Sequence, residues 1–574
     1  MTGHPGRLIL DRIPADFDRD ADVALGPWCF QGREQLCPDW ETIDFEPLFD
    51  SIEDEARAAE RLRDLVRARL PRWCARMNAR HGERGDRYWR VLLMPWLLGV
   101  AQFVWLHQRL LERIIARHGN RPLTVTVPDA GQVWDFPDTR AFVDAGLLDQ
   151  AFTAWVDGLI IAAQPPSAWT IERAPAVARP TAEPAALSMA TRVGGLRGWL
   201  RRAHGRSRFC RVNGARYSAL PMGLFLSLLP ARGAGDGDYV PGPRDPDIES
   251  RFDAGFLALL DFLEERTLPA TFTTNFAAMD ARARELRYRR GKLRVVGPLL
   301  IVDDADKFII ATAAERGEWI VCSQHGGNAV QRPLLNSPEC EYTHDAFISW
   351  GWHADGDNRG RFIPLPSPLL ARFRDRYRGG GGTAVLVTNM QRCQLFRFDG
   401  LIQYTDSIKY RRDKVAFLRH LSQANRQALR YKPYPSSEAD LDDESYVKAA
   451  FPDLQVMDGG LHGELLTCRL VVMDHCGTTL FMALAADTPT VCFWDPEVWT
   501  ANPALEEGFA ALRDAGILYH DPAQAAAHVN AVWDDVAAWW QGPAVRQARR
   551  FFVDHLARCD RAWWAAWLRA LARL

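Results

Sequence analysis

The sequence predicts an α/β fold with two lobes of parallel strands and a helical segment at the C-terminal end. Short apolar runs bounded by turn residues alternate with long helix-compatible stretches such as 54–80, the pattern of parallel sheets covered by helices. Four glycines within 378–383 precede the apolar run 384–388 and indicate an interdomain hinge. With 574 residues and 47% apolar content, the chain can fill two substantial cores.

The first lobe is expected to span residues 1–377 and to hold one Rossmann-like sheet. Loose chain rich in Ala, Pro and Gly within 164–246 predicts insertions or surface loops. The apolar stretch 91–106 contains Pro95 and Gln102 and is shorter than the roughly 20 residues that cross a bilayer, so we expect a buried or interfacial helix there. The expected strands of this lobe are 8–13, 23–25, 123–127, 271–274, 319–322 and 346–348.

The second lobe is expected to span residues 378–574 and to be doubly wound. Its expected strands are separated by helical segments and lie at 384–388, 454–457, 470–473, 490–493 and 516–519. The last stretch, 522–574, has a helical pattern and many aromatic residues. We expect it to pack across both lobes.

Composition limits the classes of partner. Basic and acidic residues nearly cancel, 70 against 72, which excludes a global field that would recruit nucleic acid. The eleven cysteines include no C-x-x-C pair, and the N-terminus has too short an apolar core for a signal peptide, so a cytoplasmic protein is expected. The 21 tryptophans leave peripheral attachment to the inner face of a membrane open, although core packing explains them more simply.

The segment 470–494 predicts a strand, a turn, a helix and a second strand. Asp474 and Gly477 lie in the turn, and Thr478 and Thr479 begin the helix. Backbone N–H groups, hydroxyls and the positive end of the helix dipole converge at such a place, which predicts a seat for a phosphate or diphosphate. The alternative is that Thr478 only caps the helix.

A second segment, WIVCSQHGGN at 319–328, ends a predicted strand with Gln324 and His325. Gly326 and Gly327 then allow a close approach of the backbone to a ligand. His325 suits a general base or a donor to a leaving phosphate because imidazole titrates near working pH. The alternative is a histidine that only bonds its own turn.

Four further residues are candidates for the acceptor side of a cleft. Thr274 and Asn275 end the expected strand 271–274, and Asp345 and Trp350 flank the strand 346–348. Asp345 could instead cap a turn, and Trp350 could instead belong to the core. Asp304 and Asp306 form a D-x-D pattern that could hold a divalent cation, but Asp306 and Lys307 are favoured as helix-start residues.

Charged residues of the second lobe complete the candidate donor site. Arg430 and Lys432, in LRYKPYP at 429–435, would bring positive charge toward the phosphate seat, with solvated charge as the alternative. Asp495 and Glu497 follow the strand 490–493 and could accept ribose hydroxyls. Glu497 is the better candidate of the two.

Five blocks, in order along most of the chain, carry a resemblance to a known family. They are LGPWC (25–29), YWRVLLMPWLL (88–98), SQHGGN followed by DAFISWGW, DHCGTTLFMALAADTPTVCFWDPEVW, and the ending around 537–552. Together they resemble the transferases of surface-carbohydrate, O-antigen and lipopolysaccharide biosynthesis loci. More distantly, the HG turn, the basic Pro-rich strand exit and the D-x-x-x-T-T helix start are similar to GT-B enzymes that use CDP-glycerol or CMP-Kdo.

The resemblance implies a cytoplasmic GT-B-like glycosyltransferase that needs no metal or other cofactor. Its partners would be a nucleotide-sugar donor on the C-terminal lobe and a polysaccharide or lipid-linked acceptor on the N-terminal lobe. His325 would inherit a catalytic role, and Thr478 and Thr479 phosphate binding. The alternatives are a polyol-phosphate transferase of the CDP-glycerol type and a non-catalytic nucleotide-sugar-binding protein.

The sequence also departs from the pattern of these relatives. Tyr434 stands where distant relatives carry a histidine between prolines, so a second catalytic histidine is not carried over. Asn328 to Val330 replace the Tyr and Gly that often follow the HGG turn, and the Arg-rich stretch 282–294 looks inserted.

Overall fold

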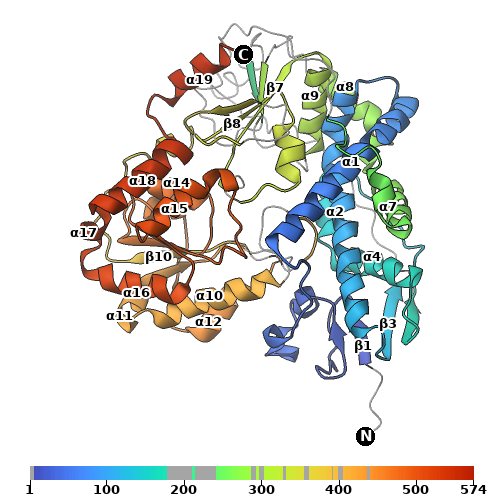
Figure 1. Cartoon of the computed structure of the whole chain (residues 1–574), viewed down its shortest axis with the longest axis horizontal. Coiled ribbons are helices and arrows are strands. Elements are labelled where there is room, and N and C mark those ends of the chain that lie inside the picture. Colours follow the sequence, from blue (N-terminus) through green and yellow to red (C-terminus); the bar gives the residue numbers. More distant parts are fainter. Residues whose placement is uncertain are drawn as a thin grey trace.

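The chain forms an α/β fold with three parallel sheets (Figure 1). The computed structural model describes residues 6–176, 210–213, 241–285, 293–296, 303–327, 331–354, 361–390, 392, 394–398, 405–435 and 440–574. Most of the loose chain expected within 164–246, the centre of the Arg-rich stretch 282–294 and residues 328–330 lie outside these ranges. The predicted class, an α/β fold of parallel sheets, is confirmed.

The C-terminal sheet is doubly wound. Its strand order is β12-β11-β10-β13-β14-β15, and each printed pairing is parallel. Successive strands run outward from β10 in one direction and from β13 in the other, so the order reverses between β10 and β13. Ligands of open α/β sheets bind at such a point, outside the carboxyl ends of the strands. The strands are β10 (Ala384–Val387), β11 (Leu429–Lys432), β12 (Gln455–Val456), β13 (Leu470–Met473), β14 (Thr490–Phe493) and β15 (Leu518–Tyr519).

The region expected to form one N-terminal lobe holds two separate parallel sheets. The first has the order β2-β1-β3-β4, with β1 (Gly6–Ile9), β2 (Val23–Ala24), β3 (Leu123–Pro128) and β4 (Trp169–Ala174). The middle sheet follows chain order, with β5 (Cys210–Asn213), β6 (Leu293–Val296), β7 (Trp319–Ser323), β8 (Ala346–Ser349) and β9 (Arg361–Pro364). The turn after β7 of the middle sheet contacts the C-terminal lobe.

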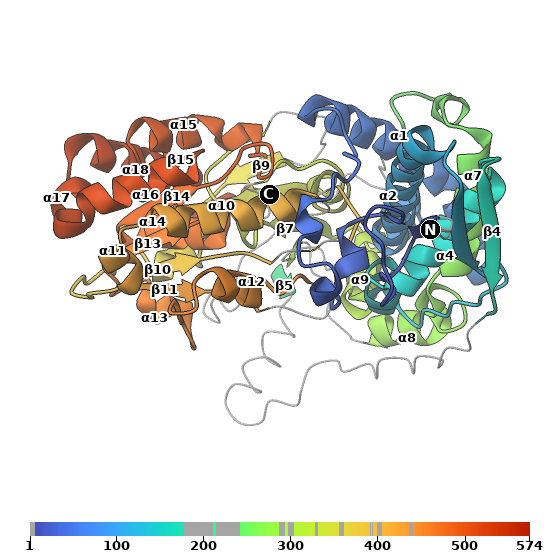
Figure 2. The same cartoon turned by 90° about the horizontal axis from the view of Figure 1, so that it is seen from below.

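A bundle of long helices lies between the first and middle sheets (Figures 1 and 2). The central helix, α2, contacts α1, α4, α7 and α9. It is the one described helix long and apolar enough to cross a bilayer, apart from the pair 139–147 and 150–163, which bends by 72°. Because 94% of its apolar stretch is buried inside the protein, α2 is a core helix, as expected for 91–106. The N-terminal helices are α1 (Ile52–His81), α2 (Asp86–His118), α3 (Thr139–Phe142), α4 (Gln150–Ala163), α7 (Ala254–Thr267), α8 (Phe276–Glu285) and α9 (Asp304–Glu315).

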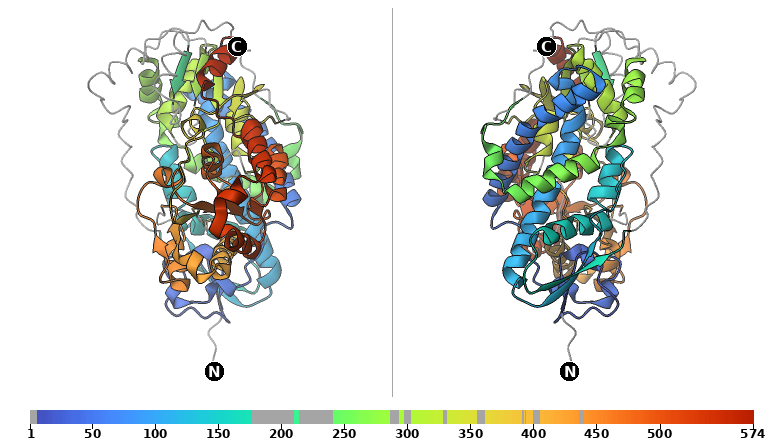
Figure 3. Two further views of the ribbon diagram at one scale, coloured as in Figure 1. Left: turned by 90° about the vertical axis from the view of Figure 1, so that its left-hand side faces the viewer. Right: turned by 90° about the vertical axis from the view of Figure 1, so that its right-hand side faces the viewer.

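The end of the chain returns from the C-terminal lobe to the middle sheet (Figure 1). Trp567 and Leu571 of α19 share a core with Val321, Ala346 and Ile348 of β7 and β8. The expected packing of the aromatic C-terminal segment across two lobes is therefore confirmed, and Figure 3 shows the end of the chain beside the strands of the middle sheet. The C-terminal helices are α10 (Asp406–His420), α11 (Gln423–Gln427), α12 (Asp443–Ala450), α13 (Leu461–Glu464), α14 (Thr478–Ala486), α15 (Glu506–Asp514), α16 (Pro522–Val532), α17 (Val536–Trp540), α18 (Pro543–Leu556) and α19 (Trp563–Leu571).

Two local expectations differ from the structure. The segment 271–274 is not a strand, because Ala270–Phe272 forms a 3₁₀ turn. The N–H groups of Ala270 and Thr271 donate to the Phe136 and Pro137 carbonyls, and the Thr271 hydroxyl donates to Asp304. The glycine run of 378–383 is not a free linker either. The Gly381 N–H donates to the Thr467 carbonyl at 2.8 Å, and a Cβ at Gly381 would lie 2.3 Å from that oxygen, so the run is packed against the C-terminal lobe.

Candidate functional site

The carboxyl ends of β7 and β13 meet between the lobes. After β7 comes His325–Gly327, here called the HGG turn, and after β13 comes Gly477–Thr479, here called the helix start of α14. The Gly327 N–H donates to Thr478 Oγ1 at 2.6 Å, although the two residues are 151 positions apart in the chain. The two segments selected from the sequence therefore touch.

The glycines of the HGG turn make this approach possible. A Cβ on Gly326 would lie 2.8 Å from Thr478 Oγ1. A Cβ on Gly327 would lie 2.5 Å from the Thr478 nitrogen and 2.8 Å from two backbone carbons of Gly477. Both positions need glycine for lack of space, because neither backbone lies in the left-handed region.

The helix start lacks a side-chain cap. Gly477 occupies the N-cap of α14, and no side chain of the described residues accepts from the first amides of the helix there. The Thr478 hydroxyl accepts from Gly327 rather than capping its own helix. Thr478, Thr479 and His325 are all half-buried, so the helix start and the HGG turn both retain exposed surface.

A buried polar network lies behind the helix start, at the reversal point of the sheet. Tyr410 of α10 donates its hydroxyl to Asp474 Oδ1 at 2.6 Å and accepts the Asn389 N–H at 2.9 Å, so it joins the ends of β10 and β13. Lys414, one turn later, pairs with Asp443 and lies 3.6 Å from Asp474 Oδ2. His475 Nδ1 lies 3.0 Å from Asp474 Oδ1.

Burial and charge set the ionisation of this network. Burial and the neighbouring Asp474 carboxylate hold the pKa of Tyr410 well above its usual value, so the hydroxyl keeps its proton. Burial would raise the pKa of Asp443, but the Lys414 ammonium and the Tyr431 hydroxyl outweigh it and lower that pKa below the ordinary value. A buried cation therefore holds the carboxylates in place.

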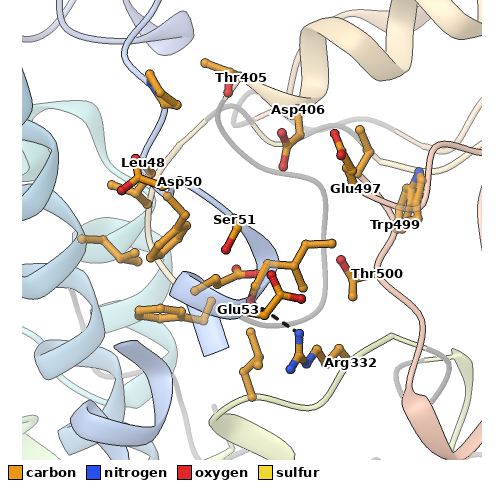
Figure 4. A pocket seen from close by; sticks show the side chains of 18 of the residues that line it. Leu48, Asp50, Ser51, Glu53, Arg332, Thr405, Asp406, Glu497, Trp499 and Thr500 are labelled. Atoms are coloured by element: carbon orange, nitrogen blue, oxygen red, sulfur yellow. Dashed lines mark hydrogen bonds between the residues drawn. The ribbon is translucent and has the colours of Figure 1, made fainter. Parts of the chain in front are cut away.

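A cavity of about 580 Å³ is lined by segments of both lobes (Figure 4). Asp406 and Glu497 face it from the C-terminal lobe, and Leu48, Asp50 and Glu53 from the opposite wall. His325, Thr478 and Thr479 do not line it. Trp499 does, and its ring lies 5.8 Å from that of His475, so the cavity reaches the helix start through one aromatic side chain.

The cavity wall ties the two lobes together. The Arg332 N–H donates to the Thr500 carbonyl at 2.9 Å, and its guanidinium donates to the Ile52 carbonyl at 3.4 Å (Figure 4). Buried His107 of α2 places Nε2 2.7 Å from the Leu395 carbonyl. The segment that follows β10 is therefore fixed to α2.

Carboxylates outnumber guanidinium groups in the cavity. Asp406 is open to the cavity, yet the surrounding protein and the facing Asp495 and Glu497 carboxylates raise its pKa to about 7. Glu497, predicted to accept ribose hydroxyls, lines the cavity and is exposed, with its N–H bonded to Asp495 Oδ1 at 2.8 Å. The lining carboxylates are Asp50, Glu53, Glu55, Asp406 and Glu497, against Arg332 and Arg397.

Gln324 and Trp350 have structural partners rather than open surfaces. The Gln324 Oε1 accepts from the Trp350 N–H at 2.9 Å and from Trp352 Nε1 at 2.8 Å, which fixes the strand exits of β7 and β8 together. Trp350 is buried and packs edge-on against Phe481 of α14. Its ring is a core contact between the lobes, so no face of it is open for a sugar.

The other acceptor-side candidates lie away from the HGG turn. Asp345 is ion-paired with Arg87 and accepts the Ile320 N–H at 2.7 Å, so its carboxylate fixes β7 to α2. Thr274 is exposed, and Asn275 bonds through its N–H to the Ala270 carbonyl. Neither of the last two lines the 580 Å³ cavity.

The two basic candidates separate. Arg430 pairs with Glu464 and donates to Thr383 Oγ1 at 3.0 Å, just before β10 begins, so it lies at the amino ends of the strands and not at the helix start. Lys432 ends β11 and lines a cavity of about 240 Å³ with Asn389 and Tyr434. It therefore stands at the carboxyl edge, on the far side of β10 from Thr478.

The D-x-D residues begin a helix, as favoured. Asp303 caps α9, and buried Asp304 pairs with Lys307 at 2.8 Å. Among the described residues, no group of three or more His, Cys, Asp or Glu side chains could hold a metal ion.

Comparison with solved structures finds distant likenesses. A mutant O-GlcNAc transferase of Thermobaculum terrenum is 13% identical, with 89% of this chain and 98% of that chain covered and a TM-score of 0.33. An α,α-trehalose 6-phosphate synthase of Burkholderia multivorans is 12% identical, with 64% and 98% covered and a TM-score of 0.32. No curated protein sequence matches.

The match to a family model is much more extensive. The model of the LIC12162 family transferases matches residues 7–571, nearly the whole chain and all three sheets. The HGG turn, the helix start and the residues that line the 580 Å³ cavity all fall inside the match. The chain therefore belongs to the LIC12162 family of transferases.

Proposed function

We propose that the chain transfers a glycosyl or related group from a nucleotide-activated donor to a cell-surface polysaccharide or O-antigen precursor. The contact between Gly327 and Thr478 carries this proposal. It brings a turn with an ionisable imidazole against a helix N-terminus whose first amides have no side-chain cap. A transfer of this kind needs a site that binds the donor phosphates and a group that accepts the acceptor's proton, and these two segments place both side by side.

The donor phosphates bind the amides and hydroxyls of Thr478 and Thr479, where the dipole of α14 adds positive potential. In the transfer step, an acceptor oxygen forms a bond to the donor's glycosyl carbon, and the bond from that carbon to the phosphate oxygen breaks. The bonding electron pair leaves with the nucleotide. The proton of the acceptor hydroxyl passes to His325.

The 580 Å³ cavity supplies room for the sugar or the acceptor, and its wall residue Trp499 packs against His475 before the helix start. Glu497 and Asp406 offer carboxylate oxygens for hydroxyl groups, and Trp499 offers an apolar wall. In this proposal the Gly327–Thr478 contact is the arrangement without donor. A donor binds the start of α14 after the HGG turn has moved off it, and the lobes then close around the donor.

Thermal unfolding with CMP, CDP, UDP and GDP conjugates tests donor binding. A specific donor stabilises the folded protein by mass action, by about 2.7 kcal/mol at 100 times its Kd. No stabilisation by any conjugate would remove the nucleotide-dependent function. Binding without transfer to any acceptor would favour a non-catalytic nucleotide-sugar-binding protein.

His325→Ala tests the chemistry once a donor is found. Donor binding should stay nearly unchanged, and turnover should fall roughly 10²- to 10⁴-fold because the proton acceptor is lost. Undiminished turnover would exclude His325 from the mechanism. A product that carries the donor's phosphate, with a nucleoside monophosphate released, would identify polyol-phosphate transfer instead.

A further inference from the structure

The most unusual side chain near the helix start is His475, which the sequence patterns do not select. It is 5% exposed and lies between the polar network and the cavity. Its Nδ1 bonds Asp474, and a Cβ on Gly477 would lie 2.9 Å from both its Nε2 and its Cδ2. The outer edge of the ring therefore covers the N-cap of α14.

The orientation of this ring is fixed from two sides. Asp474 accepts from Nδ1, and the Tyr410 hydroxyl holds the same carboxylate oxygen at 2.6 Å. Trp499 packs on the ring from the cavity side at 5.8 Å. A histidine held at Nδ1 by a carboxylate presents Nε2 to a ligand.

The charge around the ring suits an anion at Nε2. Asp474 is the charged group that faces the ring directly, with the Lys414 ammonium 3.6 Å behind its other oxygen. Tyr410 is neutral, and Trp499 and Gly477 carry no charge. From the opposite lobe the nearest titratable group on the contacting turn is His325. Nε2 thus faces the same helix N-terminus that attracts a phosphate.

We propose that His475 is a phosphate-contacting residue of the donor site, with Asp474 as the residue that positions it. This inference rests on the proposed function. The protonated Nε2–H of His475 forms a hydrogen bond to a phosphate oxygen of the nucleotide donor, beside the amides of Thr478 and Thr479. It neutralises the negative charge that the leaving nucleotide gains. It supplies a second imidazole to the site from β13, although Tyr434 replaces the histidine of distant relatives.

Two substitutions separate this role from a structural one. His475→Asn keeps an N–H near the Nδ1 position for Asp474 and deletes Nε2. His475→Gln keeps a neutral donor near the Nε2 position and deletes the charge. The matched control is His420→Gln, because His420 is exposed near the end of α10 and its side chain bonds the Ala416 carbonyl, far from the helix start.

The experiment is isothermal titration calorimetry with inorganic pyrophosphate at pH 7.5, in buffers of different ionisation enthalpy. The wild type and His420→Gln should bind with the same affinity and the same proton uptake. His475→Asn should bind roughly 10- to 100-fold more weakly, the loss of one charge-assisted hydrogen bond, and should take up fewer protons. His475→Gln should recover part of the affinity and none of the proton uptake.

Wild-type affinity and proton uptake in His475→Asn would overturn the inference, and so would a wild type that does not bind pyrophosphate. Either result would leave the proposed function to the nucleotide-conjugate screen. If the screen finds no ligand for the wild type, the proposed function fails and this inference fails with it. If the screen finds a ligand that both His475 variants bind as tightly as the wild type does, only the inference fails.

Discussion

The contact between the HGG turn and the helix start can be tested by pairing Gly326→Ala with Thr478→Ala. Among the residues that the structure describes, apart from its chain neighbours, the only atom within 4 Å of a Cβ on Gly326 is Thr478 Oγ1, at 2.8 Å. In Gly326→Ala alone, either the Thr478 side chain must rotate away or the HGG turn must move. Rotation breaks the bond from the Gly327 N–H, at about 0.5–1.5 kcal/mol, and a moved turn costs about 1–3 kcal/mol.

Hydrogen exchange at the Gly327 amide measures this cost locally. Gly326→Ala should speed exchange by roughly 2- to 13-fold, the equivalent of 0.5–1.5 kcal/mol, after correction for intrinsic rates. Thr478→Ala should also speed exchange because it removes the acceptor. In the Thr478→Ala background, Gly326→Ala should add nothing, since the obstructing oxygen is gone.

Two further variants sharpen the comparison. Gly327→Ala should remain disruptive in the Thr478→Ala background, because its Cβ would meet backbone atoms of 477–478 rather than the side chain. Gly382→Ala is the matched control, since nothing lies within 4 Å of its Cβ position, and it should leave Gly327 exchange unchanged. Equal effects of Gly326→Ala in both backgrounds would refute the contact.

Three other predictions concern ionisation and the polar network. Lys414→Met should cost about 3–5 kcal/mol at pH 7 by urea unfolding, because two buried carboxylates lose their cation. The difference in unfolding free energy from wild type should narrow only as pH falls below 3.8, since Asp443 has a lowered folded pKa whose stabilising effect is present above 3.8 and lost as pH falls through the folded pKa; a pH-independent gap would contradict this. Asp406→Asn should raise Tm at pH 8 and change it little near pH 4, because a carboxyl whose folded pKa is raised to about 7 destabilises the folded protein as pH rises. Equal shifts of Tm at both pH values would contradict this prediction. Tyr410→Phe should cost about 1–3 kcal/mol by leaving Asp474 and the Asn389 N–H short of a partner, and an unchanged unfolding midpoint would exclude the bond.

Residues that directly follow buried strands were predictable from the sequence. An apolar run ending in a Gly-containing turn marks the carboxyl end of a parallel strand, and this pattern selected both His325–Gly327 and Gly477–Thr479. Which turn meets which depends on the order of the sheets and on the packing of the lobes. The sequence does not carry that information locally, so it predicts the two turns and leaves their contact to the packing of the lobes.

The errors have equally local causes. Arg430 precedes the end of β11 by two residues, and a strand rises about 3.3 Å per residue, so its side chain leaves the sheet well behind the edge. Tyr410 and Lys414 were missed because they lie one turn apart on α10, where charged residues usually indicate a solvated face. His475 was passed over beside Asp474, since only its bond to that carboxylate shows where the ring points.

Two sheets in place of one in the N-terminal region also have a physical origin. The strands 6–9 and 319–323 carry the same apolar signature, but the long helices α1 and α2 lie between their sheets. Strand patterns report burial and not which strands pair. The number of sheets therefore follows from tertiary packing around the buried helix α2.

The central claim is that the HGG turn and the helix start form one donor site. The most direct test is a crystal structure of the protein with the nucleotide conjugate that gives the largest thermal stabilisation. The account predicts donor phosphate oxygens within hydrogen-bond distance of the Thr478 and Thr479 amides, with His325 beside the transferred group. Phosphates bound elsewhere, with the start of α14 still covered by Gly327, would contradict it.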